Sequence, residues 1–493
     1  MTSTATRTEP PLTSDRRVSG HGVRSIIGSW SRPGAAYGAL ADALRQAVLS
    51  GALPLRTRLP SERELAEALG VSRTTTTAAY DTLRDEGYLT SRRGSGTVTT
   101  LPTRLPSTTG QFRAAQGADD LVDLTTAAPF APDELHAAVR DALDLLPRYL
   151  PTTGYFPGGL PELRAAIAAR YTERGTPTTP DQVLVTTGGQ EAIHLLVGAH
   201  AGPGDRVLLE HPTYPHAIDA VRAASARPVV VPSGPDGIDL DLFASTLRQA
   251  SPRLAYLIPD HRNPTGTSLS ADARAQVREL ADRTRTLVVG DEALTDLTLE
   301  GPDPASFAGD GTSPHVACLG SASKGYWGGL RIGWVRGHRD LVGRLTVHRG
   351  HVDIGSSVLD QLVVARLLAD RDAVLARRRQ QLRERRDLVR ALIVQRLPSW
   401  TPNRPAGGLS LWVDLGAPVS SALAALAPRH GVRVAAGPAF GVEPGLERYL
   451  RVPFTEPPDR LELAVDGLAR AWAELGVDDD VRASSPTGSL VVV

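Results

Sequence analysis

The chain has 493 residues, of which 41% are apolar, and this length predicts more than one domain with large buried cores. Its 54 basic and 54 acidic side chains balance, so the overall charge gives no sign of binding to nucleic acid or to an acidic membrane surface. The single cysteine, Cys318, excludes an intrachain disulfide, and no run of residues approaches the roughly 18 apolar residues of a membrane span.

Composition also divides the chain into regions. Residues 1–20 lack the apolar core of a secretory signal, so we expect a soluble, cytoplasmic protein, without a metal site or membrane contact. The Thr, Ser, Arg and Pro of residues 1–22 predict a disordered tail. The other predicted regions are a small, mainly helical module at 23–99, a Pro-, Thr- and Ser-rich linker at 100–120, an α/β domain with a largely parallel sheet at 121–476, and a loose tail at 477–493.

The small module begins with two predicted helices. Apolar residues at helical spacing predict the first over 37–50. Ser61 and Glu64 match a capping box, in which Ser61 caps the helix and Glu64 reaches back to it. This motif predicts a second, short helix over 62–69.

A third helix is predicted over 73–86, with Ser72 as its cap and Gly87 just beyond its end. Two helices joined by a tight turn with glycine form a helix-turn-helix. The third helix opens with Arg73 and then Thr74–Thr77, although threonine is a poor helix former. A cation and four hydroxyls suit contacts with phosphates and base edges in a DNA major groove.

A hairpin over 88–98 follows, and its basic, glycine-rich tip at 92–96 is typical of a wing that lies along the DNA backbone. The segments 59–66, 70–75 and 86–89 resemble the winged helix-turn-helix of GntR-type regulators. The alternative is a helical protein-interaction module. The resemblance implies DNA contacts by Arg63, Arg73, Thr74, Thr75, Thr77, Arg93 and Gly94.

In the α/β region the most informative residue is Lys324, the single lysine among the 54 basic residues. Arginine can replace lysine on a surface or at a phosphate, but it cannot form a Schiff base because its guanidinium stays protonated. Lys324 follows Ser321 and Ser323 and precedes Arg331, which is the pattern of a covalent pyridoxal 5'-phosphate (PLP) site with the serines and Arg331 on the phosphate. The alternative is one stray lysine in a protein that uses arginine elsewhere.

Three further apolar strands end in residues that suit the same cofactor. In open α/β sheets, ligands bind beyond the carboxyl ends of the strands. Asn263 follows a strand and is placed to hydrogen-bond the cofactor's phenolate oxygen, although Asn-Pro-Thr-Gly alone is better explained as a tight turn. Asp291 would keep the pyridine nitrogen protonated. Backbone N–H groups at a helix start would meet the phosphate at Gly188, Gly189 and Gln190.

The order Asn263, Asp291, Lys324, Arg331 resembles that of fold-type I aminotransferases. The resemblance implies a large α/β PLP-binding domain with a small C-terminal α+β subdomain. It also implies that Tyr155 contacts the phosphate in a neighbouring subunit, so that the protein is a homodimer. By the same resemblance, Tyr214 stacks on the pyridine ring and Arg451 binds the carboxylate of an amino acid.

Two positions depart from the family pattern. Leu294 stands where the family usually has a tyrosine that shares the phenolate oxygen with the asparagine, and Ala127 stands where a glycine often lets the backbone approach substrate. Both departures weaken the case for fast turnover more than the case for cofactor binding.

A winged helix joined to an aminotransferase-like domain resembles the MocR family of bacterial regulators over about residues 35–475. The resemblance implies a dimeric transcriptional regulator that binds operator DNA and holds PLP on Lys324. An amino ligand on Arg451 that displaces Lys324 would bias the arrangement of the winged helices. Two alternatives stay open: a working aminotransferase that carries a DNA-binding module, and a regulator that senses PLP itself.

Overall fold

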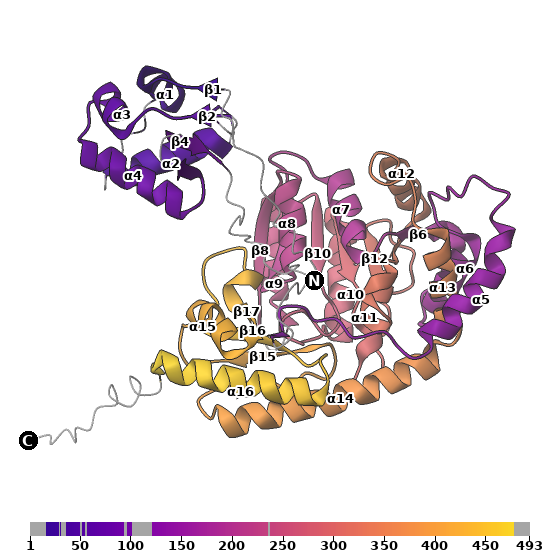
Figure 1. Ribbon diagram of the computed structural model, residues 1–493. Coiled ribbons are helices and arrows are strands. Elements are labelled where there is room, and N and C mark those ends of the chain that lie inside the picture. Colours follow the sequence, from indigo (N-terminus) through magenta and orange to yellow (C-terminus); the bar gives the residue numbers. More distant parts are fainter. Residues whose placement is uncertain are drawn as a thin grey trace, which may run out of the picture. The chain divides into compact units, whose positions relative to one another are not determined.

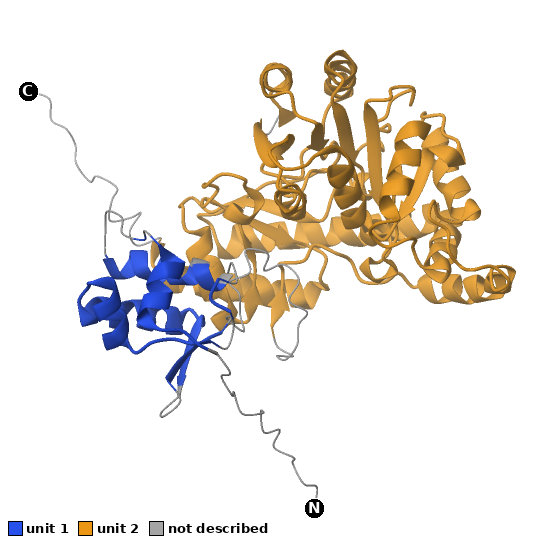
Figure 2. Cartoon of the chain, turned by 90° about the horizontal axis from the view of Figure 1, so that it is seen from above, with its two compact units in different colours: residues 1–110 blue, residues 111–493 orange. Residues whose placement is uncertain are grey.

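The computed structural model describes residues 16–28, 30, 36–49, 52–54, 57–92, 96–100, 121–234 and 237–477. The chain divides into two compact units, Met1–Gly110 and Gln111–Val493 (Figure 2). Nearly all of the predicted linker, most of the predicted N-terminal tail and all but the first residue of the C-terminal tail lie outside the described residues.

The small unit contains helices packed on a four-stranded sheet of order β1-β2-β4-β3. Its buried core joins residues of the helices and the hairpin, among them Leu44, Leu65 and Tyr80. The elements are β1 (Arg16–Arg17), α1 (Gly20–Ile27), α2 (Ala36–Leu49), β2 (Thr57–Arg58), α3 (Glu62–Leu69), α4 (Arg73–Asp85), β3 (Leu89–Arg92) and β4 (Gly96–Thr99).

The predicted disorder of residues 1–22 is wrong for residues 16–22. β1 pairs in parallel with β2, and α1 begins at Gly20, capped by the side chain of Ser19. Glu64 also departs from prediction, because its carboxylate accepts from the backbone N–H of Gly20 at 3.3 Å instead of reaching back to Ser61. This contact joins α1 to α3 over a long distance in the chain. The polar composition of residues 1–22 could not predict it.

The large unit is built around an eight-stranded sheet of order β6-β13-β12-β11-β10-β7-β8-β9 (Figure 1). The pairs β7–β8, β7–β10, β10–β11 and β11–β12 are parallel, whereas β13 runs antiparallel to both of its neighbours and β9 runs antiparallel to β8. The strands are β6 (Val183–Thr186), β7 (Arg206–His211), β8 (Arg227–Gly234), β9 (Gly237–Ile238), β10 (Leu254–Leu257), β11 (Leu287–Asp291), β12 (Val316–Ser321) and β13 (Gly333–Arg336).

Both faces of this sheet are buried, as a parallel sheet with crossover helices requires. Along β11, Val288 packs into one core cluster, and its neighbours Leu287 and Val289 pack into the other. The first face is covered by α5 (Leu135–Leu145), α6 (Pro161–Glu173), α9 (Leu240–Ala250), α10 (Ala271–Thr284) and α13 (Val358–Ala369). The second is covered by α7 (Gly189–His200), α8 (Pro215–Ala223) and α12 (Arg339–Arg349).

A C-terminal subdomain has its own core and a sheet of order β14-β15-β18-β17, which confirms the predicted α+β subdomain. Its long helix α14 (Arg371–Arg396) lies beside α16 (Pro458–Leu475) in Figure 1. β5 (Val122–Asp123) pairs with β16 (Val432–Arg433), so the start of the large unit joins this subdomain. The other elements are α11 (Ala322–Gly325), β14 (Thr401–Pro402), β15 (Ser410–Asp414), α15 (Ser420–Leu426), β17 (Ala435–Ala436) and β18 (Tyr449–Pro453).

Candidate functional site

Lys324 lies just beyond the carboxyl end of β12, in the short helix α11. β12 runs parallel to β11, whose last residue is Asp291, and Asp291 pairs in register with Leu319. The Nζ of Lys324 donates a 2.8 Å hydrogen bond to the carbonyl oxygen of Ala127, 197 residues earlier in the chain. The structure therefore brings the lysine, the aspartate and the segment with the atypical alanine to one edge of the sheet.

The environment of Lys324 lowers the pKa of its amine to about 8. Burial is the largest cause, because the protein interior disfavours the ammonium form. The guanidinium groups of Arg451 and Arg331 lower this pKa further, and the carboxylate of Asp291 raises it. A substantial fraction of Lys324 is therefore neutral near pH 8, which is the nucleophilic form of an amine.

Asp291 is buried at the end of β11 and is held by two donors. Its Oδ1 accepts from the backbone N–H of Ala293 at 2.9 Å, and its Oδ2 accepts from the hydroxyl of Tyr256 in β10. Burial raises the pKa of Asp291, and both hydrogen bonds oppose that shift because they favour the carboxylate. Sequence reasoning missed Tyr256, whose one signal is a hydroxyl-bearing side chain inside an otherwise apolar strand.

Next to β12, the turn from β6 into α7 approaches β13 very closely. Gly188 has φ +86°, a conformation that favours glycine. A Cβ on Gly333 would lie 2.5 Å from the carbonyl carbon of Gly188, so any side chain there would displace the turn. Arg331 donates to the carbonyl oxygen of Thr187 at 3.2 Å, and Ser321 caps α11 by accepting from the N–H of Ser323. We call this group of residues, Thr187–Gln190, Ser321, Ser323 and Arg331, the phosphate cradle.

Arg451 lies on β18 and is almost fully buried. It donates to the carbonyl oxygen of Thr125 and, at 3.3 Å, to Oδ1 of Asn263, and it stacks on Phe440 at 4.9 Å from the ring centroid. Its Nε has no hydrogen-bond acceptor among the described residues. Burial lowers the pKa of Arg451 to about 10. A carboxylate is the acceptor that such a guanidinium lacks.

Tyr214 and Gln190 complete the predicted cofactor residues. Tyr214 is the N-cap of α8, and burial together with the nearby Asp291 carboxylate raises the pKa of its hydroxyl. Arg451 and Arg331 act on that hydroxyl in the opposite direction. Gln190 donates to the carbonyl oxygen of His216 at 3.2 Å, and its own buried Oε1 has no donor among the described residues.

The turn that holds Asn263 rests on a buried ion pair that the sequence did not reveal. Arg262 Nη2 lies 2.6 Å from Glu210 Oε1, and both side chains are fully buried. Glu210 Oε2 also accepts from the backbone N–H of Ile258 at 2.7 Å. Glu210 and Arg262 therefore fix the Asn263 turn to β7 and β10. They lie 52 positions apart in the chain (262 minus 210), so no local motif joins them.

Among the described residues, two predicted positions, Tyr155 and Leu294, make no contact with this cluster through their side chains, and Ala127 meets it through its backbone alone. Tyr155 is 67% exposed, so its ring makes little contact within its own chain. Leu294 is buried in the core of the C-terminal subdomain. Ala127 packs against that same core and meets Lys324 through its carbonyl oxygen, not its side chain.

In the small unit, Arg73 and Thr74 are exposed at the start of α4, and Arg63 is exposed on α3 with its side chain 79% accessible. Thr77 is partly buried and donates to Glu62 at 3.3 Å. Thr76 corrects the prediction of four outward hydroxyls, because it is buried and donates to backbone carbonyl oxygens. Thr75 is partly buried beside Ser72, and Arg93 and Gly94 lie outside the described residues.

Comparison with known proteins identifies both units. Residues 133–468 match the model of the aminotransferase class I and II family. The chain belongs to that family. Residues 36–98 match the bacterial regulatory proteins of the gntR family, so the chain joins a GntR DNA-binding domain to an aminotransferase domain. This confirms the resemblance to MocR-type regulators.

Relatives of both kinds are similar to the chain. The "Probable rhizopine catabolism regulatory protein MocR" of Rhizobium meliloti is 30% identical over 73% of this chain and 78% of that protein. The 2-aminoadipate transaminase of Thermus thermophilus is 31% identical over 69% of this chain and 83% of the enzyme. The crystal structure of LysN, α-aminoadipate aminotransferase of Thermus thermophilus complexed with N-(5'-phosphopyridoxyl)-L-leucine, has a TM-score of 0.67 at 28% identity and covers 73% of this chain and 94% of that one.

Class I and II aminotransferases are PLP-dependent, and the residues of this chain fit that cofactor. The lysine has a lowered pKa, glycines let the turn after β6 lie against Arg331 and β13, and Arg451 has an unused donor. Among the described residues, no helix has the length and apolar character needed to cross a membrane.

Proposed function

We propose that the protein is a PLP-dependent transcriptional regulator whose aminotransferase domain senses an amino acid or amine. The carrying observation is that Lys324 and Asp291 lie at one edge of the large sheet, and Arg451 reaches Asn263 from β18 of the C-terminal subdomain, in a chain that also has a GntR domain. The contacts among these residues span the large unit, so a ligand there is placed to alter its conformation.

Each residue has a distinct task. Lys324, through its neutral amine, would hold the cofactor covalently, and Asp291 would keep a proton on its pyridine nitrogen. The phosphate cradle would hold the phosphate, Tyr214 would pack on the ring, and Asn263 would donate to the phenolate oxygen. When bound, PLP supplies a carbonyl carbon that reacts with amines and a ring that withdraws electrons.

Arg451 gives the site its preference for ligands that carry a carboxylate. Its partners in this structure are neutral: a backbone carbonyl oxygen, the amide oxygen of Asn263 and the ring of Phe440. A buried cation without a charged partner gains most from an anionic ligand.

A homodimer in the bacterial cytoplasm completes the proposal. Tyr155 is exposed in its own chain and is available to reach the phosphate of a neighbouring subunit. Exposed apolar side chains near it in the sequence, Phe130 and Leu150, are suited to burial in an interface. A dimer would present two winged helices to paired half-sites on DNA.

The proposal is tested by measuring binding of the purified full chain to DNA from upstream of its own gene, with and without PLP and amino acids. Sequence-specific binding that changes when PLP or an amino acid is added supports a PLP-linked regulator. A response to PLP alone supports the alternative hypothesis that the regulator senses PLP itself. Only salt-sensitive, non-specific binding contradicts both.

A catalytically active aminotransferase is the second candidate, favoured by the similarity to the 2-aminoadipate transaminase. In that case Lys324 Nζ would carry a proton to and from the α-carbon of the substrate. Steady turnover of amino acids with 2-oxo acids, lost in Lys324→Ala, would support this function. The two departures from the family pattern, Leu294 and Ala127, predict that such turnover is slow.

A further inference from the structure

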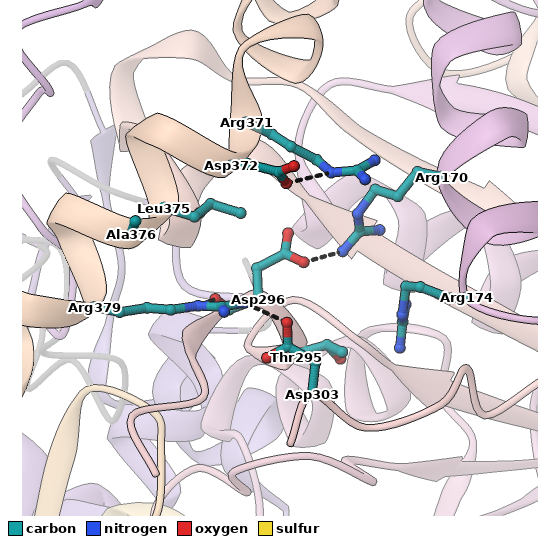
Figure 3. A pocket seen from close by; sticks show the side chains of 10 residues that line it. All are labelled: Arg170, Arg174, Thr295, Asp296, Asp303, Arg371, Asp372, Leu375, Ala376 and Arg379. Atoms are coloured by element: carbon teal, nitrogen blue, oxygen red, sulfur yellow. Dashed lines mark hydrogen bonds and ion pairs between the residues drawn. The ribbon is translucent and has the colours of Figure 1, made fainter. Parts of the chain in front are cut away.

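The large unit has a cavity of about 280 Å³, lined by the end of α6, the turn after Leu294 and the first turns of α14 (Figure 3). None of its lining residues belongs to the proposed cofactor site. They are Arg170, Arg174, Thr295, Asp296, Asp303, Arg371, Asp372, Leu375, Ala376 and Arg379.

The arginine side chains around this cavity are more buried than most of their carboxylate partners. The four arginine side chains are between 3% and 28% exposed. Three of their carboxylate partners, Asp303, Glu173 and Asp372, are at least 54% exposed, so these ion pairs contribute little stability. Asp296 and Glu292 are the two acidic partners that lie deeper. The lining residues themselves carry four guanidinium groups and three carboxylates, those of Asp296, Asp303 and Asp372, a net charge of +1.

Arg170 supplies the strongest sign that an acceptor is missing. Its side chain is 3% exposed, and its Nη2 pairs with Asp296, which stands between Arg170 and Arg379 in Figure 3. Its Nη1 has no hydrogen-bond acceptor among the described residues. Arg174 lies beside it and donates to both carboxylate oxygens of Glu292 at 3.4 Å and to the carbonyl oxygen of Pro304 at 3.2 Å. A buried donor without an acceptor is costly, and an oxyanion would satisfy it.

The segment that contains Thr295 and Asp296 connects the cavity to the proposed cofactor site. Asp296 lies five residues after Asp291 in the same segment. The hydroxyl of Thr295 donates to Asp260, which lies at the start of the turn that carries Asn263. Asp260 is itself buried and paired with Arg274. A ligand that draws Arg170 away from Asp296 would therefore act on the segment that positions Asp291 and Asn263.

We propose that this cavity binds a small oxyanion, a carboxylate or a phosphate, as a second ligand site separate from the PLP site. The site uses the guanidinium groups of Arg170, Arg174, Arg371 and Arg379, and it does not depend on the function proposed above.

The test is equilibrium dialysis of labelled inorganic phosphate against the full chain saturated with PLP, at constant ionic strength. We expect saturable binding of one phosphate per chain. Binding should weaken at least tenfold in Arg379→Gln and in Arg371→Gln, and it should be unchanged in Arg377→Gln. Arg377 lies on the same helix but outside the cavity, where it is paired with Glu134. Thermal unfolding checks that each variant is folded, and Arg371→Gln serves alone if Arg379→Gln is not.

Absence of saturable binding, or equal binding in both cavity variants and the wild type, overturns the proposal and leaves an adventitious ion only. A chain that does not hold PLP would show an additional phosphate bound at the cradle, which Arg331→Gln removes and Arg379→Gln does not. Failure of the PLP proposal is thus distinguished from failure of this one. Competition by succinate supports a carboxylate ligand, and its absence supports a phosphate.

Discussion

At the scale of single residues, Lys324 stands among more positive than negative charge. Arg451 and Arg331 lower the pKa of its amine, Asp291 alone raises it, and burial adds to the lowering. This arrangement keeps the amine neutral at a pH where an exposed lysine, with a pKa of about 10.4, is protonated.

A pH profile of cofactor attachment follows. The rate at which the apoprotein binds PLP covalently should rise with pH, because only the neutral amine attacks, and should reach half its maximum near pH 8. Arg451→Gln removes the cation that most lowers this pKa, so the midpoint should move to higher pH. Stopped-flow absorbance measures the rate. Arg448→Gln, an exposed arginine just before β18, is the control. An unmoved midpoint in Arg451→Gln would refute the electrostatic explanation.

Tyr256 should support the charge of Asp291. In Tyr256→Phe the carboxylate loses one of its two donors, so its pKa rises further and PLP affinity falls by about tenfold, as expected for a hydrogen bond to a charged group. The loss should be larger at low pH, where the carboxyl gains a proton. Titration of PLP between pH 6 and 9 measures it. Tyr326→Phe is the control, because the Tyr326 hydroxyl has no hydrogen-bond partner among the described residues. Equal losses in the two variants would contradict the role of Tyr256.

At the scale of elements, the β6–α7 turn depends on the absence of side chains. Gly333→Ala should displace Gly188 and its N–H groups, destabilise the fold by about 1–3 kcal/mol as overpacking does, and weaken PLP binding. Gly202→Ala, where a Cβ meets nothing within 4 Å, should change neither property. Denaturant unfolding and PLP titration measure both effects. A Gly333→Ala protein with wild-type affinity would show that the turn does not hold the phosphate.

The start of α4 allows a matched comparison of two threonines. Thr76→Val loses the hydrogen bond that the hydroxyl shares between the carbonyl oxygens of Glu62 and Arg73, and it should reduce stability by about 1 kcal/mol with little effect on DNA affinity of the folded protein. Thr74→Val, at an exposed position, should leave stability unchanged and weaken specific DNA binding by about tenfold. Denaturant unfolding and gel-shift titration separate the two properties. The opposite pattern would mean that α4 is not the helix that contacts DNA.

The same elements show how far a local pattern reaches. The caps at Ser61 and Ser72 and the helices that they begin follow from a few adjacent residues, and the structure has them. The direction of Thr76 and the partner of Glu64 depend on α3 and α1, which lie across the small unit's core. Tertiary packing decides contacts of that kind, so the capping motif and the residue types alone did not predict them.

At the scale of the whole molecule, the proposed dimer makes cofactor binding depend on protein concentration. If Tyr155 contacts the phosphate of a neighbouring subunit, PLP affinity should fall when the chain is diluted below its dimer dissociation constant. Sedimentation velocity should show a species of twice the 52.3 kDa chain mass. Tyr155→Phe should weaken PLP binding at every concentration while leaving the dimer intact. A monomer with concentration-independent affinity would contradict the shared site.

The sequence alone determined the two-domain organisation, the helix-turn-helix, the strand ends and the single lysine, because each depends on short-range periodicity, capping or residue type. It also placed Asn263, Asp291 and Lys324 at the ends of apolar strands. Only the tertiary structure decided that Tyr256 supports Asp291, that the carbonyl of Ala127 meets Lys324, that Glu210 pairs with Arg262, and that four arginines line a cavity. These contacts join residues far apart in the chain, and no local pattern records which side chains folding brings together.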